Sequence, residues 1–281
     1  MMGVVNVTPD SFSDGGSWFD RDKAIGHGLD LVAAGADVVD VGGESTRPGA
    51  QRVTLEEELR RVVPVVSALA ADGVPVSVDT MRAEVAEAAV GAGARLVNDV
   101  SGGLADPAMA RVVAAARVPY VVMHWRGHSH DMYSRAVYAD VVREVRDELL
   151  RRVDALLGEG VDPSMIVLDP GLGFAKNPAS LDNWALIAHL EALTGTGHPV
   201  LVGASRKRFL GKLLAGSDGT PRPFAGSDDA TVAVTALAAA AGAWCVRVHR
   251  VAPNADAVRI AAAVRAARGA GPGSDGGEPR G

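Results

Sequence analysis

The sequence predicts a single-domain α/β protein, and within that class a (β/α)8 barrel, on three observations. Short runs rich in Val, Ile and Leu alternate eight times with helix-like segments. The chain has 281 residues, and such barrels commonly use about 250 residues as one unit. Nearly every apolar run ends in a polar residue, whereas an open doubly wound sheet would gather its polar residues at one switch point. We therefore expect a barrel over 1–268 and a flexible, Gly- and Pro-rich tail over 269–281.

The expected strands read as continuous hydrophobic runs, as parallel strands covered by helices on both faces do. In chain order they are MGVVNV (2–7), DVVDVG (37–42), VPVSVD (74–79), RLVNDV (95–100), PYVVMH (119–124), MIVLDP (165–170), PVLVGAS (199–205) and WCVRVH (244–249). The helix-like segments that follow them are 21–34, 54–71, 82–91, 107–116, 139–157, 179–193, 207–215 with 229–241, and 254–267.

The segment 139–157 shows the helical period most clearly. Apolar residues recur there at three- and four-residue steps while charged residues fill the rest, so one face is expected to be buried. The apolar residues are Val142, Val145, Leu149, Val153 and Leu156.

Composition excludes several classes of function. The 28 basic and 34 acidic side chains give a net charge of −6, so broad attraction to nucleic acid is not expected. Cys245 is the single cysteine, which excludes an internal disulfide, and it lies in an apolar run as a small buried hydrophobe would. The start MMGVVNV lacks the features of a secretory signal, and no run approaches about 18 apolar residues. We expect a cytoplasmic protein with neither a membrane nor a nucleic-acid partner.

Other binding motifs match weakly. GLGFAK (171–176) lacks the third glycine of a dinucleotide loop, and GASRKRFLGK (203–212) has no Gly five residues before its GK pair. His124, His128 and His130 suggest a metal, but neither an HExxH-type helix nor a cysteine partner accompanies them, so zinc is disfavoured.

Polar side chains at the strand ends form the candidate site. Asp79, Asn98 and Asp169 offer acceptors and an amide, which suit the donor-rich edge of a planar heterocycle that carries amino and ring N–H groups. The alternative is that the two carboxylates only cap the helices that follow. The other strand ends carry Asn6, Asp40, His124, Ser205 and the pair Arg247 and His249.

Basic residues near the last two strands indicate an anion. Arg247 and His249 lie two apart on a strand, so they point to the same side and suit a phosphate or diphosphate. The alternative is a structural salt bridge from Arg247 to an aspartate of the rim. The SRKR cluster (205–208) begins a helix, where anions or carbonyl oxygens bind favourably, and its alternative role is a solvated turn.

Taken together, seven segments resemble the bacterial dihydropteroate synthases, in the order of that family and across nearly the whole chain. The Ala-rich texture and MHWR (123–126) look like its actinobacterial members. The segments are MGVVNVTPDSFSDGG (2–16), DVGGESTRPGA (40–50), SVDT (77–80), VNDVSGG (97–103), LDPGLGFAK (168–176), VGASRKRFLG (202–211) and RVH (247–249).

The resemblance implies a TIM-barrel transferase of folate synthesis and a sulfonamide target. Such an enzyme joins 6-hydroxymethyl-7,8-dihydropterin diphosphate to 4-aminobenzoate and releases diphosphate. Family members are commonly homodimers, which makes a homodimer the implied assembly.

The resemblance also implies roles for residues of this sequence. Asn6, Lys207, Arg247 and His249 would be catalytic. Asn6, Arg247 and His249 would meet the diphosphate, with Mg2+ bridging Asn6 to its oxygens. The pterin would be bound by Asp79, Asn98, Asp169 and Lys207, with Met123 and Phe174 against the ring. Two loops would close over the site and complete the aminobenzoate pocket through Phe12, Asp14, Thr46, Arg47 and Pro48.

The implied mechanism is dissociative: the methylene C–O bond breaks first and the aniline nitrogen then attacks. An arylamine is largely neutral at pH 7, so no strong general base is demanded and fixed charges lower the barrier. Two positions depart from the family pattern. Arg250 follows His249 where Asp or Asn is more usual, and Arg208 follows Lys207 where some members have Ser.

Two other functions remain open at this level. A methyltetrahydrofolate:corrinoid methyltransferase would share the recognition of the pterin ring but needs no diphosphate set. A catalytically silent paralogue would bind pterins without turnover.

Overall fold

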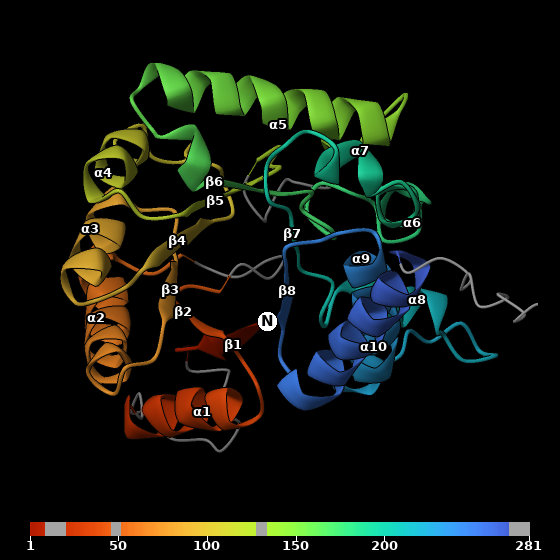
Figure 1. Ribbon diagram of the computed structural model, residues 1–281, viewed down its shortest axis with the longest axis horizontal. Helices are drawn as coiled ribbons and strands as arrows, with labels where there is room; N and C mark the ends of the chain where they lie inside the picture. Colours follow the sequence, from red (N-terminus) through yellow and green to blue (C-terminus); the bar gives the residue numbers. More distant parts are fainter. Residues whose placement is uncertain (9–20, 46–51, 128–133, 270–281) are drawn as a thin grey trace, which may run out of the picture.

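A closed ring of parallel strands surrounded by helices forms the molecule (Figure 1). The computed structural model describes residues 1–8, 21–45, 52–127 and 134–269. The strand order is β6-β5-β4-β3-β2-β1-β8-β7, and every pair is parallel. An isolated bridge between Leu168 and Val200 joins β6 to the segment that leads into β7. The expected single-domain (β/α)8 barrel is therefore confirmed.

The strands are β1 (Met2–Asn6), β2 (Val38–Gly42), β3 (Val76–Asp79), β4 (Leu96–Asp99), β5 (Tyr120–Met123), β6 (Ile166–Asp169), β7 (Leu201–Val202) and β8 (Cys245–Val248). The helices are α1 (Arg21–Ala33), α2 (Leu55–Ala71), α3 (Ala83–Gly91), α4 (Met109–Ala116), α5 (Val141–Gly158), α6 (Asp182–Ala188), α7 (Glu191–Thr194), α8 (Arg208–Leu213), α9 (Asp228–Ala240) and α10 (Val251–Gly269). Short 3-10 turns cover η2 (Pro163–Met165) and η3 (Ala225–Ser227).

Several helix boundaries differ from the sequence expectation, most clearly those of α6, α7 and α10. The segment 179–193 is two helices, α6 and α7, because His189 leaves the helical conformation with φ −119° and ψ 38°. Helix α10 begins at Val251, three residues earlier than expected, and includes Pro253 in its first turn, where the missing N–H of proline costs nothing. Apart from Gly269, the tail expected over 269–281 lies outside the described residues.

The barrel interior changes from apolar to polar along its axis. Side chains of alternate residues on each strand face inward. At the amino-terminal end these form a small apolar cluster of Met2, Leu96, Val121, Val167, Leu201 and Cys245. The larger hydrophobic core lies between the strands and the helices, where α5 buries Val145, Leu149, Val153 and Leu156 as expected, whereas Val142 is half-buried.

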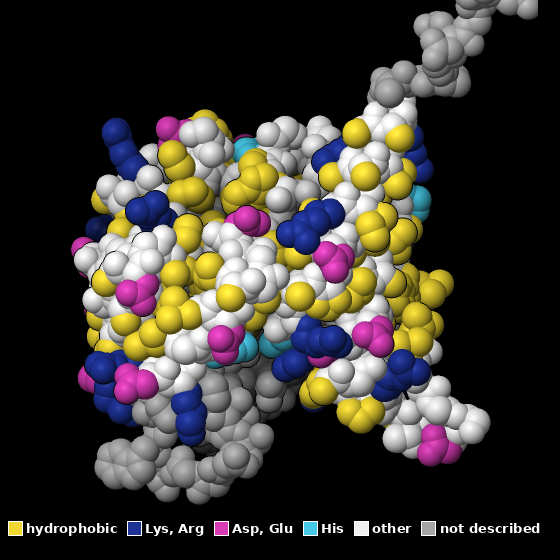
Figure 2. Space-filling model, turned by 60° about the horizontal axis from the view of Figure 1, so that its bottom comes forward, with side chains coloured by type: hydrophobic (Ala, Val, Ile, Leu, Met, Phe, Trp, Pro, Cys, Tyr) yellow, Lys and Arg dark blue, Asp and Glu magenta, His cyan; other side chains and the backbone are white. Residues whose placement is uncertain are grey.

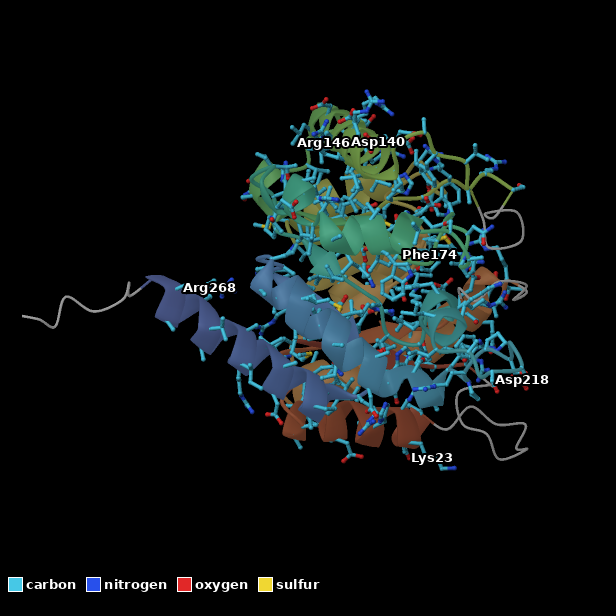
Figure 3. The ribbon with its side chains drawn as sticks, turned by 90° about the vertical axis from the view of Figure 1, so that its right-hand side faces the viewer. Lys23, Asp140, Arg146, Phe174, Asp218 and Arg268 are labelled. Atoms are coloured by element: carbon cyan, nitrogen blue, oxygen red, sulfur yellow. The ribbon has the colours of Figure 1, made fainter. Side chains whose placement is uncertain are left out.

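The strand register brings the polar strand ends together. Asn6 pairs with Gly42, Gly42 with Asp79, and Asp79 with Asn98, so these residues lie at one level of the barrel. Arg268 near the end of α10 marks one end of the barrel in Figure 3, and Asp218, in the loop after α8, marks the other. In the described parts of the chain, no helix is both long and apolar enough to cross a bilayer.

Candidate active site

A pocket opens at the carboxyl end of the strands and collects seven of the nine predicted site residues that the structure describes; Asn6 and Asp79 are not in its lining. Its cavity volume is about 30 Å3, within about 430 Å3 of space that includes open solvent. Its lining consists of Asn98, Val100, Met123, Asp169, Leu172, Phe174, Gly203, Ser205, Lys207, Arg247 and His249. These residues come from five strand ends (β4 to β8) or the loops behind them, as expected for a barrel whose catalytic groups lie at this face.

Arg247 is the centre of a buried ion-pair cluster. Its Nε donates to Oδ2 of Asp40 at 2.6 Å, and its Nη2 donates to Oδ2 of Asp79 at 2.7 Å. Asn98 donates from Nδ2 to the same oxygen of Asp40 at 3.0 Å. Burial opposes the charge, but the two aspartates hold the pKa of Arg247 above its ordinary value. Arg247 therefore stays a cation that points into the barrel.

The salt bridge considered as an alternative role for Arg247 is thus present, and it does not remove Arg247 from the pocket. The guanidinium carries five N–H donors, of which the two aspartates use two in this cluster. It still lines the pocket beside His249. A guanidinium held in place by two carboxylates can present its remaining donors to an anion without rearranging.

Asp40 is the site residue whose importance sequence reasoning missed. The sequence marked it only as a polar strand end, yet its side chain is completely buried and accepts from both Arg247 and Asn98. Its second oxygen, Oδ1, has no hydrogen-bond partner among the described residues. A carboxylate in the middle of the apolar run DVVDVG was the available signal, because burial of an unpaired aspartate is costly.

Asp169 lies at the end of β6 and does not cap the helix that follows, since α6 begins only at Asp182. Its Oδ1 accepts from the backbone N–H of Gly171 at 2.7 Å, which fixes the turn after β6, and the residue also lines the pocket. Burial raises the pKa of Asp169 to about 6, against the effect of the Gly171 N–H and of Lys207. Burial likewise raises the pKa of Asp79, with Arg247 opposing. The protonation of both carboxyl groups should therefore respond to a ligand that donates N–H hydrogen bonds to them.

Lys207 lies directly before α8, and its ammonium faces an aromatic ring. Nζ is 3.8 Å from the centroid of the Phe174 ring, a cation–π contact. Burial, and next the charge of Arg247, lower the pKa of Lys207 to about 8. Helix α8 has six residues and begins at Arg208, so it is shorter than the segment expected over 207–215.

The remaining basic residues of the SRKR cluster have structural partners or face solvent. Arg206 adopts a left-handed conformation with φ 58° and pairs with Asp228 at 3.3 Å. Arg208 is exposed. Arg250, the departure beside His249, is 52% exposed and lies 3.6 Å from Asp229, so its charge belongs to the surface.

His249 is oriented by Ser205. The Ser205 Oγ lies 2.9 Å from Nδ1 of His249 and accepts from the His249 backbone N–H at 3.2 Å. These two contacts fix the orientation of the imidazole ring. Ser205 is thus a second residue whose part in the site the sequence did not define.

Five expected residues lie outside the described part of the chain: Phe12, Asp14, Thr46, Arg47 and Pro48. His128 and His130 also lie outside it, and among the described residues no three His, Cys, Asp or Glu side chains are grouped as metal ligands. Asn6 ends β1 and is half-buried at the level of Asp79. The amide oxygen of Asn6 is a hard ligand of the kind that Mg2+ binds. Mg2+ commonly takes one such protein ligand together with phosphate oxygens and water.

Comparison with known proteins supports this picture. Residues 2–249 match the family described as "Pterin binding enzyme". The dihydropteroate synthase of Mycobacterium leprae is 57% identical over 94% of this chain and 92% of its own length. The Xanthomonas albilineans dihydropteroate synthase, solved in complex with 7,8-dihydropteroate, has a TM-score of 0.83 at 44% identity and covers 94% of this chain and 93% of its own. The Yersinia pestis enzyme, solved with a sulfonamide drug complex, has a TM-score of 0.86 at 39% identity and covers 95% and 93%.

The family match spans all eight strands and thus the strand ends that line the pocket. The chain therefore belongs to the pterin binding enzyme family and, within it, to the bacterial dihydropteroate synthases of actinobacterial type.

Proposed function

We propose that the pocket at the carboxyl end of the barrel condenses 6-hydroxymethyl-7,8-dihydropterin diphosphate with 4-aminobenzoate, giving 7,8-dihydropteroate and diphosphate. The observation that carries the proposal is the meeting of Asp169 and Asn98 with Arg247 and His249 in one pocket. The first two suit a heterocycle rich in N–H groups, and the last two suit a diphosphate. The substrate needs both sets in one place.

The pterin ring is placed at Asn98, Asp169 and Lys207, with Met123 and Phe174 on its faces. A buried carboxylate that accepts from ring N–H and amino groups recovers the hydration it lost on folding. Asp79 takes part through Arg247, to which it is bonded. Apolar contact with Met123 and the Phe174 ring then contributes binding free energy that depends on the flat shape of the pterin ring.

The diphosphate is placed at Arg247, His249 and Asn6. Arg247 can form a forked pair of hydrogen bonds with phosphate oxygens, and His249 supplies a further ring nitrogen. Asn6 would hold Mg2+ together with diphosphate oxygens; the ion supplies charge neutralisation of the leaving group.

The chain's own residues promote a dissociative substitution. When the methylene C–O bond breaks, positive charge spreads over the dihydropterin ring and negative charge grows on the departing diphosphate. Asp169 faces the first, and Arg247, held by Asp79, faces the second. The neutral aniline nitrogen of aminobenzoate then forms the new C–N bond and loses a proton. Fixed charges that match those of the transition state are among the largest contributions to catalysis.

The aminobenzoate site is assigned to Phe12, Asp14, Thr46, Arg47 and Pro48 by resemblance, and this stays a prediction. Sulfonamides are expected to compete at the same place. The cytoplasmic location also stays a prediction.

A homodimer is proposed as the assembly. Large apolar side chains are exposed on or beside the last two helices: Leu237 on α9, Trp244 before β8, and Ile260 and Val264 on α10 are 45–65% exposed. In Figure 2, hydrophobic side chains lie along the right-hand part of the molecule, below the point where α10 leads into the grey C-terminal tail. Exposed apolar surface of this kind is typical of protein–protein contacts.

The decisive experiment measures diphosphate release by the purified protein with Mg2+ and the pterin diphosphate, with and without aminobenzoate. We expect release that depends on aminobenzoate and yields dihydropteroate. Pterin binding without release would favour a silent paralogue. Methyl transfer from methyltetrahydrofolate to a corrinoid would favour the methyltransferase.

A further inference from the structure

Lys176 is a completely buried amine for which the proposed mechanism has no use. It lies in the loop between β6 and α6, two residues after Phe174. Its Nζ donates to the backbone oxygen of Phe174 at 3.0 Å and lies 3.1 Å from Nδ1 of His124. Burial lowers the pKa of Lys176 to about 7. Burying an amine costs free energy, so a role is expected for Lys176 and for the two contacts that hold it.

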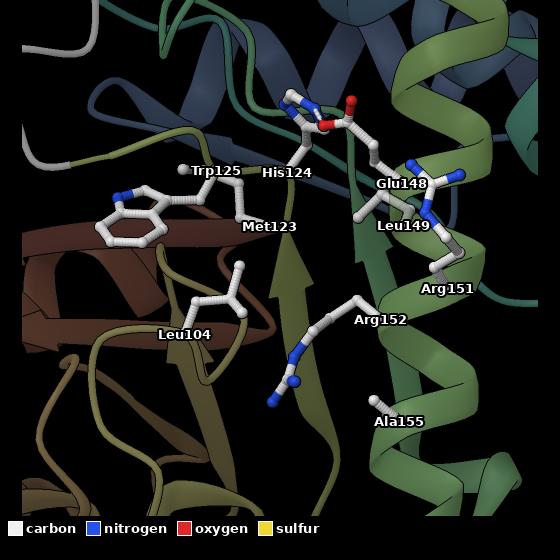
Figure 4. A pocket seen from close by; sticks show the side chains of 9 residues that line it. All are labelled: Leu104, Met123, His124, Trp125, Glu148, Leu149, Arg151, Arg152 and Ala155. Atoms are coloured by element: carbon white, nitrogen blue, oxygen red, sulfur yellow. Dashed lines mark hydrogen bonds and ion pairs between the residues drawn. The ribbon is translucent and has the colours of Figure 1, made fainter. Parts of the chain in front are cut away.

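The second contact is set up by Glu148 on α5. The Nε2 atom of His124 lies 2.8 Å from Oε2 of Glu148, and Figure 4 shows the two side chains facing each other beside a cavity of 280 Å3 on the outside of the barrel. Burial lowers the pKa of His124 to about 4, so the ring is neutral at pH 7. Hydrogen bonds from His124 and Arg126 lower the pKa of Glu148 to about 2.

The protonation states of His124 and Glu148 fix the direction of each hydrogen bond that links Glu148, His124 and Lys176. Glu148 is a carboxylate and only accepts, so the single ring N–H of His124 is on Nε2. Nδ1 is therefore the acceptor, and Lys176 donates to it. His124, which Glu148 orients from the outer side of the barrel, therefore accepts a hydrogen bond from the Lys176 ammonium. A second N–H of that ammonium donates to the backbone oxygen of Phe174.

The loop that Lys176 holds has a costly backbone conformation. Gly171, Gly173 and Ala175 have φ of 66°, 78° and 47°. For Ala175 the left-handed region is unfavourable, because its Cβ approaches the following carbonyl. Such a conformation persists only where surrounding contacts determine it.

Side chains on both sides of Phe174 supply those contacts. The Tyr138 hydroxyl donates to the Ala175 oxygen at 2.8 Å, and Asn183 accepts from the Gly173 N–H at 2.7 Å. Phe174 itself donates from its N–H to the Gly171 oxygen at 3.0 Å, while Lys176 binds its carbonyl. Both ends of the Phe174 peptide are therefore fixed, and with them the ring that contacts Lys207.

We propose that Lys176 is a positioning residue for the pterin pocket: held by His124 and Glu148, it fixes the backbone of Phe174 and so the ring surface against which Lys207 and the pterin lie. The inference rests on the proposed pterin site. It assigns a part in substrate binding to a hydrogen-bonded chain that begins on the outside of the barrel.

The test is a double-mutant cycle on pterin affinity. The Kd of the pterin diphosphate is measured by calorimetry, with aminobenzoate withheld, for Lys176→Met, Phe174→Ala and the double variant. We expect Lys176→Met to raise Kd about tenfold, or about 1.4 kcal/mol. In the Phe174→Ala background the same change should alter Kd less than twofold, because the ring it positions is gone. Lys212→Met, at an exposed lysine of α8, is the matched control and should leave Kd unchanged.

The outcomes separate this inference from the proposed function. Equal effects of Lys176→Met in both backgrounds, or none in the first, would overturn the positioning role. An unchanged Kd for Phe174→Ala alone would show instead that the proposed pterin site is wrong.

A second pair of variants applies if Lys176→Met does not fold. In His124→Asn an amide oxygen replaces Nδ1 and still accepts from Lys176, whereas in His124→Gln the amide reaches the position of Nε2 and leaves Lys176 without this acceptor. We expect His124→Gln to raise Kd severalfold and His124→Asn to stay within about twofold of the natural protein. Equal affinities in the two variants would contradict the proposal.

Discussion

Replacing Arg247 with methionine tests whether the ion-pair cluster supports both the fold and the reaction. The change keeps an unbranched side chain but leaves the carboxylates of Asp40 and Asp79 buried without their cation. Removing one partner of a buried ion pair typically costs about 3–5 kcal/mol. For a chain of this length each kcal/mol corresponds to roughly 2–4 °C, so we expect Tm to fall by roughly 6–20 °C.

The loss should depend on pH in a defined direction. Burial already raises the pKa of Asp79, and without Arg247 this carboxyl takes up a proton more readily still. Proton uptake by the folded variant relieves the unpaired charge. The stability difference between Arg247→Met and the natural protein should therefore be smaller at pH 5.5 than at pH 8.

The assay is urea unfolding at both pH values, together with steady-state release of diphosphate. Asp40→Asn and the double variant complete a cycle, and we expect a coupling free energy of about 1–3 kcal/mol between the two positions. Activity of Arg247→Met should fall at least a hundredfold in protein that remains folded, because a charge facing the leaving group is lost. Unfolding within 1 kcal/mol of the natural protein, or equal losses at both pH values, would refute this account of the cluster.

Three further predictions concern other parts of the molecule. Asp169→Asn should weaken pterin binding at least tenfold by calorimetry, yet raise the free energy of unfolding at pH 7 by roughly 1–3 kcal/mol. A buried carboxyl whose pKa is raised to about 6 loses folded-state stability as pH rises from about 4 to 6, and asparagine does not; a destabilised variant would contradict this. Ser205→Ala should lower kcat about tenfold and leave pterin Kd unchanged, because it removes the partner that orients His249, and an equal change in Kd would argue against that role. Ile260→Glu should convert a dimer to a monomer in light scattering, and a natural protein that is monomeric at micromolar concentration would remove the homodimer proposal.

The sequence predicted the barrel well because its signals are local. Each strand is a continuous apolar run, and all eight lie within the expected ranges. The break between α6 and α7 left no comparable mark, since no proline or glycine stands at His189.

The site was predictable residue by residue but not as a network. Asp169, Asn98, Arg247 and His249 were marked by their place at strand ends, and the structure brings them into one pocket. Which carboxylate pairs with Arg247 depends on contacts between β2, β3 and β8, which are distant in the chain. The part played by Lys176 likewise depends on a helix that joins it only in three dimensions.

One feature of the barrel wall bears on how a flat substrate enters. Seven neighbouring strand pairs are joined by ladders, whereas β6 meets the β7 segment through the Leu168–Val200 bridge and the Leu168–Pro199 hydrogen bond. Pro199 has no N–H, so the ladder is thin at this seam. The loops beyond β6 and β7 carry Phe174 and Lys207, whose ring and ammonium are in contact. Parting the wall at its weakest join would separate this pair while the rest of the cylinder keeps its shape.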